Sequence, residues 1–478
     1  MTEIPAYHRA KSPLWRWAAV FGVGLAIYLF PAPEGVSSEA WVLLAIFIAT
    51  IVGSIVQPLT GSAIVLLGVI ATVIFGALTP VAALRGYSES VVWLVLAAFF
   101  LSVGMIKTGL GRRIALLFVR AIGRKTIGLG YALVATDFVL ASMIPSNAAR
   151  NGGVILPIAK GACETYDSRP DDGTAGRLGT FLMNLLYQCD IIICATFITG
   201  QASNIIIADL AARNAGIQLG YAGWFAAAIV PSLVSLVVVP FAILRLSPPE
   251  VKETPAAAEF ARAELDKLGS MSLNEKLMLG VLFLVVAFWT AKGHLHNIDT
   301  AIVALAGIGV LLLAKVVDWR DLMGEQNAWS VFIWYGGLVN MASELNDTGL
   351  TRIFAESMGA YTGGMSWMAA LALLTLIYFY SHYLFASITG HVLAMFVPFV
   401  AVTMTAGAPL GLAVLVLAFF SNLSAGLTHY GTTPAPIYFG TGYVTLKRWW
   451  TVGFAASVLN IAVWSTVGVI WWKLLGWW

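Results

Sequence analysis

Apolar stretches about as long as a lipid bilayer is thick run through almost the whole chain, with short polar segments between them. A helix needs about 20 apolar residues to cross the hydrocarbon core, and the sequence holds about eleven such stretches. The 478 residues are 59% hydrophobic and only 11% charged, with a mean hydropathy of +0.85. No soluble globular protein has that composition. We therefore predict an all-α polytopic membrane protein.

The predicted spans lie near residues 14–31, 39–56, 61–79, 89–107, 180–212 (interrupted), 222–245, 276–291, 298–315, 329–346, 408–440 (interrupted) and 451–473. Two further apolar pairs, 127–163 and 366–402, are predicted to be re-entrant hairpins that enter and leave the membrane on one face. Broken backbone of this kind is tolerated at membrane depth only where protein or a cavity surrounds it.

Basic residues collect in alternate loops, beginning with Arg9 and Lys11 before the first span. Because cytoplasmic loops carry the excess of Lys and Arg, this pattern predicts a cytoplasmic N-terminus. The first apolar stretch follows those charges as in a signal peptide, but no convincing cleavage site comes after it, so we expect it to stay as a span. Without a transit-peptide pattern, we expect a multi-pass protein of a bacterial inner membrane.

The second half of the chain repeats features of the first. Ser90-Val91 recurs as Ser330-Val331, and the Thr-Gly-Leu sequence at 108–110 recurs at 348–350. In both cases the second copy lies 240 residues after the first. By the span count, Arg112 and its counterpart Arg352 fall on opposite sides, so the copies have inverted topology, as in many secondary transporters. The predicted domains are an extra span at 1–35, a first repeat at 36–246 with hairpin 127–163 and broken helix 180–212, a cytoplasmic linker at 247–275, and a second repeat at 276–478 with hairpin 366–402 and broken helix 408–440.

The first hairpin turns at a polar tip that contains Ser146, Asn147, Ala148 and Arg150. An arginine at membrane depth is expensive and is a functional-site candidate by default. Its planar fork can grip a carboxylate with two hydrogen bonds. A helix beginning at the tip would also expose N–H groups to an anion.

The second hairpin turns at Ser387, Thr389, Gly390 and His391, with the basic residue again four positions after the serine. Each hairpin is followed by a span with a polar interruption, where unwound backbone can contact a ligand. The candidate ligand-binding residues in these interruptions are Gly200, Gln201 and Asn204 in the first half, and His429, Tyr430, Gly431, Thr432, Thr433 and Pro434 in the second.

Structural roles compete with these assignments. Serine and asparagine at a tip can simply cap the following helix. Arg150 can pair within the protein with Asp137 or Asp190. Asp190, Asp209 and Glu344 can relay protons, although interhelical hydrogen bonds are the favoured interpretation for them.

Enzymatic constellations are missing from the sequence. It has no Walker-type glycine loop, HExxH helix or GxSxG elbow. The three cysteines, Cys163, Cys189 and Cys194, lie in or beside apolar segments and have no zinc spacing. We predict that the protein is not an enzyme and uses neither a cofactor nor a metal.

The motifs resemble those of the divalent anion:sodium symporter family of di- and tricarboxylate transporters. The family has a Ser-Asn-Thr tip in each hairpin, and here the tips read Ser-Asn-Ala at 146–148 and Ser-Ile-Thr at 387–389. With SNAAR at 146–150, TGH at 389–391 and LTHYGTTPAPIYFGTGYV at 427–444, these departures resemble the branch of plastid 2-oxoglutarate/malate translocators and bacterial citrate/succinate and tartrate/succinate antiporters.

The resemblance implies a homodimeric elevator-type transporter in which Ser146, Asn147, Ser387 and Thr389 contact substrate carboxylates. Its sodium-coupled members bind sodium at the hairpin tips and unwound loops. Here Arg150, and His391 if charged, would stand beside those cations, and a unit charge about 4 Å away costs roughly 4 kcal/mol at an effective dielectric of about 20. We therefore expect sodium-independent exchange of 2-oxoglutarate, malate, succinate and, as further candidates, citrate or tartrate. A fixed cation would hold back the empty carrier until a dianion binds.

Two other classes stay open from the sequence. A sodium- or proton-coupled symporter for the same acids would need intact cation sites. An anion channel would pass currents beyond carrier rates, and a sensor would need a signalling domain where the chain has only the short linker.

Overall fold

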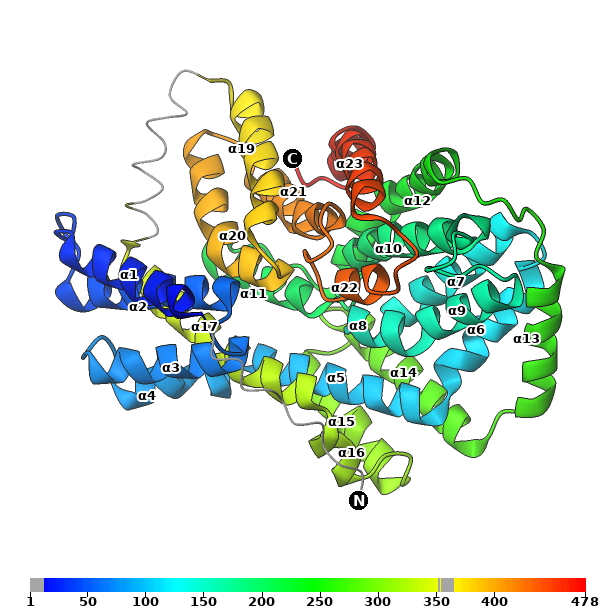
Figure 1. Ribbon diagram of the computed structural model, residues 1–478. Coiled ribbons are helices and arrows are strands. Elements are labelled where there is room, and N and C mark those ends of the chain that lie inside the picture. Colours follow the sequence, from blue (N-terminus) through cyan, green and yellow to red (C-terminus); the bar gives the residue numbers. More distant parts are fainter. Residues whose placement is uncertain (1–12, 351–352, 354–364) are drawn as a thin grey trace. The chain divides into compact units, whose positions relative to one another are not determined.

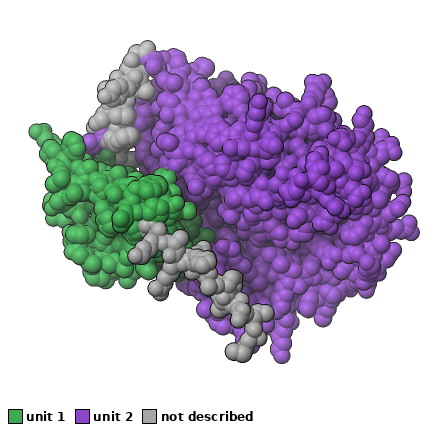
Figure 2. Space-filling view, viewed as in Figure 1, with its two compact units in different colours: residues 1–89, 330–351 green, residues 90–329, 352–478 purple. Residues whose placement is uncertain are grey.

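The computed structural model describes residues 13–350, 353 and 365–478. Arg9, Lys11 and Arg352, used above to assign topology, lie outside these residues. The chain divides into two compact units, residues 1–89 with 330–351 and residues 90–329 with 352–478, which Figure 2 shows in different colours.

The first unit is built from α1 (Leu14–Leu29), α2 (Ser38–Val56), α3 (Gly61–Ile74), α4 (Pro80–Leu84), η1 (Arg85–Ser88) and most of α17 (Gln326–Asp347). α2 packs against α1 and α3. Asn340 on α17 donates from Nδ2 to the carbonyl of Ala82 at 2.7 Å, and Arg85 lies 3.4 Å from Glu344. Long-range polar contacts thus fasten α17 to the N-terminal helices of its own unit.

The second unit begins with α5 (Ser90–Thr108), α6 (Leu110–Ile122), α7 (Thr126–Ala141), α8 (Asn147–Arg150), η2 (Asn151–Ile155), α9 (Leu156–Thr165), η3 (Ala175–Arg177), α10 (Gly179–Thr196), α11 (Ala202–Ala215), α12 (Tyr221–Leu246), α13 (Pro255–Leu268), α14 (Leu273–Ala291), α15 (Thr300–Leu313) and α16 (Trp319–Gly324). It continues with α19 (Trp367–Ser381), η4 (His382–Leu384), α20 (Ile388–Thr405), α21 (Leu410–Leu423), η5 (Ser424–Gly426), α22 (Pro434–Phe439), α23 (Leu446–Val463), η6 (Trp464–Gly468) and α24 (Val469–Leu474).

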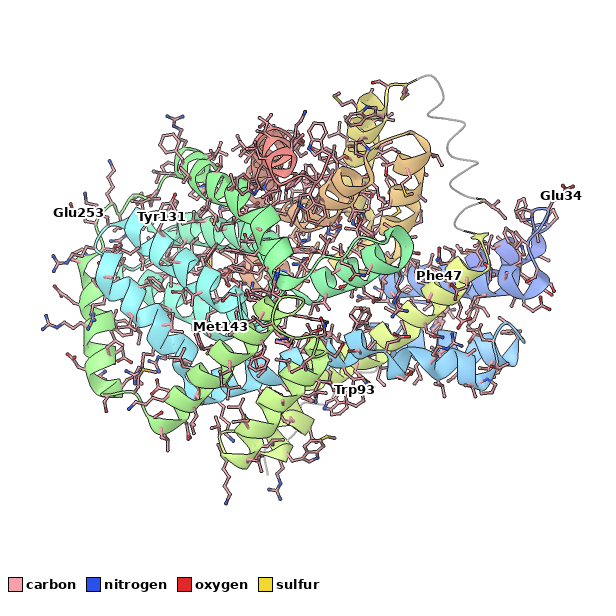
Figure 3. The ribbon with its side chains drawn as sticks, turned by 180° about the vertical axis from the view of Figure 1, so that it is seen from behind. Glu34, Phe47, Trp93, Tyr131, Met143 and Glu253 are labelled. Carbon is pink, nitrogen blue, oxygen red and sulfur yellow. The ribbon has the colours of Figure 1, made fainter. Side chains whose placement is uncertain are left out.

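The centre of the second unit is α10, which packs against α7, α12 and α21 (Figure 1). From Phe181 to Thr196 every side chain of this helix is buried. Tyr131 on α7, labelled in Figure 3, donates from its hydroxyl to the Leu236 carbonyl of α12 at 3.1 Å. A helix buried on all sides needs partners all round, and α10 therefore anchors the segments that carry the candidate site.

In the described part of the chain, eight helical stretches are long and apolar enough to cross a membrane: α2, α5, α10, α12, α14, Trp367–Leu384, Ile388–Thr405 and Leu446–Leu474. Every predicted span coincides with a helix or a broken pair of helices, although α1, α3 and α15 have only 16, 14 and 14 residues. The fold is all-α, as predicted for a polytopic membrane protein. The two stretches of the second hairpin are each 18 residues long, so their re-entrant course stays a prediction.

The segment predicted as a linker contains one amphipathic helix, α13, which packs against α6. Arg113 on α6 forms a buried ion pair with Glu275 at 2.6 Å and donates to the Gly269 carbonyl at 2.9 Å. Because this buried arginine makes both an ion pair and a hydrogen bond, it holds the end of the segment in place.

Candidate functional site

The first hairpin turns between α7 and α8, at residues 142–151, which we call the first tip. Met143, labelled in Figure 3, follows the end of α7. Ser146 is the N-cap of the next helix, and its hydroxyl accepts from the Ala149 amide at 3.2 Å. The helix then runs through α8, the π-helical turn η2 and α9. Pro157 in α9 has no N–H to donate to the preceding turn, which is a local reason for the widened π turn.

Arg150 lies inside the protein, with none of its side chain exposed. Its Nε donates to Asp137 Oδ1 at 2.7 Å, and its Nη2 donates to Asp190 Oδ1 at 3.1 Å. Its Nη1 donates to the carbonyls of Ile144 and Gly200, each at 2.7 Å. The guanidinium is therefore committed to protein acceptors, which is the alternative given above for this residue. In this geometry it is not free to grip a substrate carboxylate.

Asn151 extends the same cluster. Its Nδ2 donates to Asp190 Oδ1 at 2.8 Å, and its Oδ1 accepts from the Tyr438 hydroxyl at 2.6 Å. Tyr438 belongs to α22 in the second half of the chain. The cluster around Arg150 therefore joins α7, the first tip, α10 and α22.

The break between α10 and α11, residues 197–201, forms the first loop. Asn204 fixes it by donating from Nδ2 to the carbonyls of Cys194 and Phe197 at 2.6 and 2.9 Å. A Cβ on Gly200 would lie 2.7 Å from the Cys194 Cα, closer than real Cβ contacts. Glycine at 200 thus allows the loop to fold back on α10 and point its carbonyl at Arg150.

The second hairpin turns at residues 385–391, the second tip. Ser387 caps α20, its hydroxyl accepting from the Gly390 amide at 3.5 Å. Ser387 is exposed, and Thr389 and Gly390 are half-buried. His391 is fully buried beside the Tyr378 ring, 4.4 Å between centroids, and its Nε2 lies 3.0 Å from the Ser381 hydroxyl. His391 makes no ion pair with a described residue.

The second loop, residues 424–433, binds the first tip and the segment that precedes the second tip. Asn147 Nδ2 donates to Thr432 Oγ1 at 3.4 Å, and His382 Nε2 donates to the Gly431 carbonyl at 2.9 Å. A Cβ on Gly431 would stand 3.0 Å from both the Ala425 oxygen and His382 Nε2. His382 therefore holds the second loop in the way that Arg150 holds the first.

The broken helices also contact each other directly. Asn422 on α21 donates to Asn204 Oδ1 at 2.8 Å, and its own Oδ1 accepts from Gln201 Nε2. Gln188 on α10 donates to the Gly426 carbonyl at 2.8 Å. The first tip, both loops and His382, which precedes the second tip, are thus joined by hydrogen bonds within one unit.

Exposure separates the predicted site residues into two groups. The buried ones are Ser146, Asn147, Arg150, Gly200, Gln201, Asn204, His391, Gly431, Thr432 and Pro434. The half-buried or exposed ones are Ala148, Thr389, Gly390, His429, Tyr430, Ser387 and Thr433. Only the second group can meet a ligand without a rearrangement of the described residues.

Sequence reasoning gave His382 no functional part and did not name Asn151, Asn422 or Tyr438. His382 follows α19 directly, one turn before the second tip, and that position beside a polar tip was the available signal. The two asparagines and the tyrosine sit inside helices, where only their partners across the fold distinguish them from ordinary core polar residues.

A polytopic helical protein whose two hairpin tips and two unwound loops belong to one compact unit is a secondary transporter by fold and site. The chain belongs to the family described as the sodium:sulfate symporter transmembrane region, whose model matches residues 11–478. This confirms the family predicted from the motifs and the expectation of a transporter and not an enzyme.

Three relatives illustrate the family. The chain is 44% identical over 472 residues to dicarboxylate transporter 1, chloroplastic, of Arabidopsis thaliana, covering 97% of this chain and 85% of that protein. It is 35% identical to the inner membrane protein YbhI of Escherichia coli, over 98% of this chain and 99% of that one. It is 30% identical to the L-tartrate/succinate antiporter of Shigella sonnei, over 96% and 97% of the two chains.

Proposed function

We propose that this protein is a sodium-independent antiporter for di- and tricarboxylate anions: 2-oxoglutarate, malate and succinate first, and citrate or tartrate as further candidates. The names of two relatives, a dicarboxylate transporter and a tartrate/succinate antiporter, support the substrate class. The alternative is a sodium- or proton-coupled symporter for the same acids.

The observation that carries sodium independence is the position of the Arg150 guanidinium. Its Nη1 bridges the Ile144 carbonyl of the first tip and the Gly200 carbonyl of the first loop, each at 2.7 Å. Carbonyls of unwound backbone are the groups that coordinate sodium in many transporters. With the guanidinium bonded to both oxygens, a sodium ion has no room there.

The substrate contacts that we propose lie at the accessible residues of the tips and the second loop. Ser387, Thr389 and Thr433 offer hydroxyls, and the first turn of α20 offers backbone N–H groups that no helical carbonyl satisfies. The buried residues Arg150, His391, Gly200, Gln201 and Asn204 then act as positioning residues that hold the loops in place.

Uptake of labelled 2-oxoglutarate into proteoliposomes tests the proposal. We expect uptake that requires internal dicarboxylate and is unchanged when choline replaces sodium. Uptake into empty vesicles that follows a sodium or proton gradient would replace the antiporter by the symporter.

The substrate contact at Ser387 has a matched control in Ser366, whose hydroxyl caps α19 by accepting from the Ala369 amide at 3.3 Å. Losing either cap costs a helix about 1 kcal/mol. Ser387→Ala should also raise the KM for 2-oxoglutarate several-fold, whereas Ser366→Ala should leave it unchanged. Equal KM values in the two variants would remove Ser387 from the substrate site.

We also propose a homodimer with an elevator movement, in a bacterial inner membrane with the N-terminus in the cytoplasm. That both tips and both loops belong to one compact unit supports their moving together. The inner-membrane name of the Escherichia coli relative supports the location. Light scattering in detergent tests the dimer, and labelling of a cysteine introduced at the N-terminus, from either side of the membrane, tests the orientation.

A further inference from the structure

The cluster around Arg150 contains two carboxyl groups and one guanidinium, and its charges do not balance. Asp137 and Asp190 both contact Arg150, and their side chains are 4% and 0% exposed. With both acids ionised, the cluster would carry one excess negative charge out of contact with water. Two like charges at such a site cannot both stay ionised without compensation.

The hydrogen bonds show which carboxylate oxygens have no donor to compensate their negative charge. Oδ1 of each aspartate accepts from Arg150, but neither Asp137 Oδ2 nor Asp190 Oδ2, both buried, has a hydrogen-bond partner among the described residues. Both carboxyl groups bind the same guanidinium, Asp137 at Nε and Asp190 at Nη2. Because buried polar groups are normally satisfied, an acceptor left without a donor beside an excess negative charge is a place for a proton.

The neighbouring side chains do not supply a positive charge that would balance the second aspartate. The titratable side chains around the pair are Cys189 and Cys194 on α10, Tyr187 on α10 and Tyr438 on α22. All of them are neutral acids, so losing a proton would add negative charge. The Tyr187 and Tyr438 hydroxyls donate elsewhere, to the Ala425 carbonyl and to Asn151. No group of three or more His, Cys, Asp or Glu residues that could hold a metal is found in the described part of the chain.

We propose that Asp190 carries a buried proton on Oδ2 while Asp137 stays ionised, so that the Arg150 cluster is electrically neutral. Asp137 has the shorter contact with the guanidinium, 2.7 Å against 3.1 Å, and is therefore the ionised partner. Asp190 Oδ1 accepts from Arg150, Asn151 and Cys194, which leaves Oδ2 as the oxygen that carries the proton.

This site is distinct from the substrate contacts at the second tip, and its test does not depend on transport. Infrared spectroscopy of the purified protein near neutral pH detects the C=O stretch of a buried protonated carboxyl group. We expect this band in the wild type, and we expect it to be lost in Asp190→Asn. It should also be lost in Asp137→Asn, because Asp190 would then be the only anion on Arg150 and would ionise.

A matched control is Asp209→Asn, which changes another aspartate that pairs with an arginine, Arg213, at 3.0 Å on α11. The band should persist in this variant. The amide introduced by Asp190→Asn can accept from Arg150 and is uncharged, like the protonated acid, so this variant should also fold and keep its thermal stability. If either aspartate variant fails to fold, the wild-type spectrum still decides whether a protonated carboxyl group is present.

Absence of the band in the wild type would overturn the proposal. So would a band that survives in both Asp137→Asn and Asp190→Asn, since it would belong to another acid. If the wild-type protein shows the expected infrared band but does not exchange dicarboxylates in proteoliposomes, the proposed transport function is wrong and the proton site still stands.

Discussion

Removing Arg150 tests its position between the first tip and the first loop most directly. Arg150→Ala deletes the donors to Asp137, Asp190, Ile144 and Gly200 together. Removing one partner of a buried ion pair costs about 3–5 kcal/mol, because the other charge is left buried and unpaired. That is a large part of a total stability of about 5–15 kcal/mol.

A loss of this size is measurable as a shift in apparent Tm. We expect a decrease on the order of 10 °C, taking a few degrees for each kcal/mol. All three cysteines are free and buried, so a dye that reacts with thiols reports unfolding without a tag. Exchange should fall with the loss of the first loop's geometry.

Sodium distinguishes the proposed role from simple structural support. Arg150→Ala leaves two carbonyls and two aspartates facing a space that a cation can fill. Sodium should therefore raise the Tm of this variant and leave the wild type unchanged, since binding to the folded state at about 100 times Kd adds about 2.7 kcal/mol. The control is Arg113→Ala, which breaks the buried pair with Glu275 and leaves one carboxylate only. A wild-type Tm for Arg150→Ala, or an equal sodium response in all three proteins, would refute the reasoning.

Two further substitutions address the second loop. Gly431→Ala places a Cβ 2.9 Å from Thr428 Oγ1 and 3.0 Å from the Ala425 oxygen, so it should lower the Tm by several degrees and slow exchange, whereas Gly280→Ala, with nothing within 4 Å, should do neither. His382→Ala removes the donor to the Gly431 carbonyl and should cost about 1–3 kcal/mol, while His382→Gln, which keeps a donor, should lose less. Thermal scans and counterflow rates measure both, and equal stability of the two His382 variants would exclude the hydrogen bond as the cause.

The sequence predicted the helix starts and helix breaks around the candidate site, because these obey local rules. A serine before a polar turn marks a helix start, and Ser146 and Ser387 both cap helices. Runs of apolar residues with polar interruptions marked the broken helices, because unsatisfied backbone is tolerated at membrane depth only in protected places. The resulting helices lie where the apolar pattern predicted them.

The hydrogen-bond partners of the basic residues could not be predicted from local sequence rules. Asp137 and Asp190 are 13 and 40 residues from Arg150 in the chain, and only the packing of α7 and α10 brings both carboxylates to it. The internal repeat suggested that His391 corresponds to Arg150. In the structure it is His382 that bonds an unwound loop, and His391 packs among aromatic rings. The alignment of the two repeats predicted a basic residue at position 391, but it could not predict the direction in which the His391 side chain points.

The pairing of Arg150 also changes the physical basis of exchange. The sequence suggested a fixed cation that holds back the empty carrier, but the ion pair with Asp137 compensates this charge. In the first turns of α8 and α20, the Ala149 and Gly390 amides donate to the cap serines and the Ala148 amide to the Asn147 side chain, while the remaining N–H groups have no helical carbonyl to bind. Burying each such group without an acceptor costs about 1–3 kcal/mol, so the empty tips resist closing.

A dianion can satisfy both tips, because it carries a carboxylate for each of them. A monocarboxylate of similar length can satisfy one tip and leaves the other without an acceptor. We therefore expect internal succinate to drive uptake of labelled 2-oxoglutarate into proteoliposomes and internal butyrate to leave uptake at the level of empty vesicles. Equal counterflow with the two acids would mean that a single carboxylate suffices and that unsatisfied N–H groups at the second helix start are not what holds back the empty carrier.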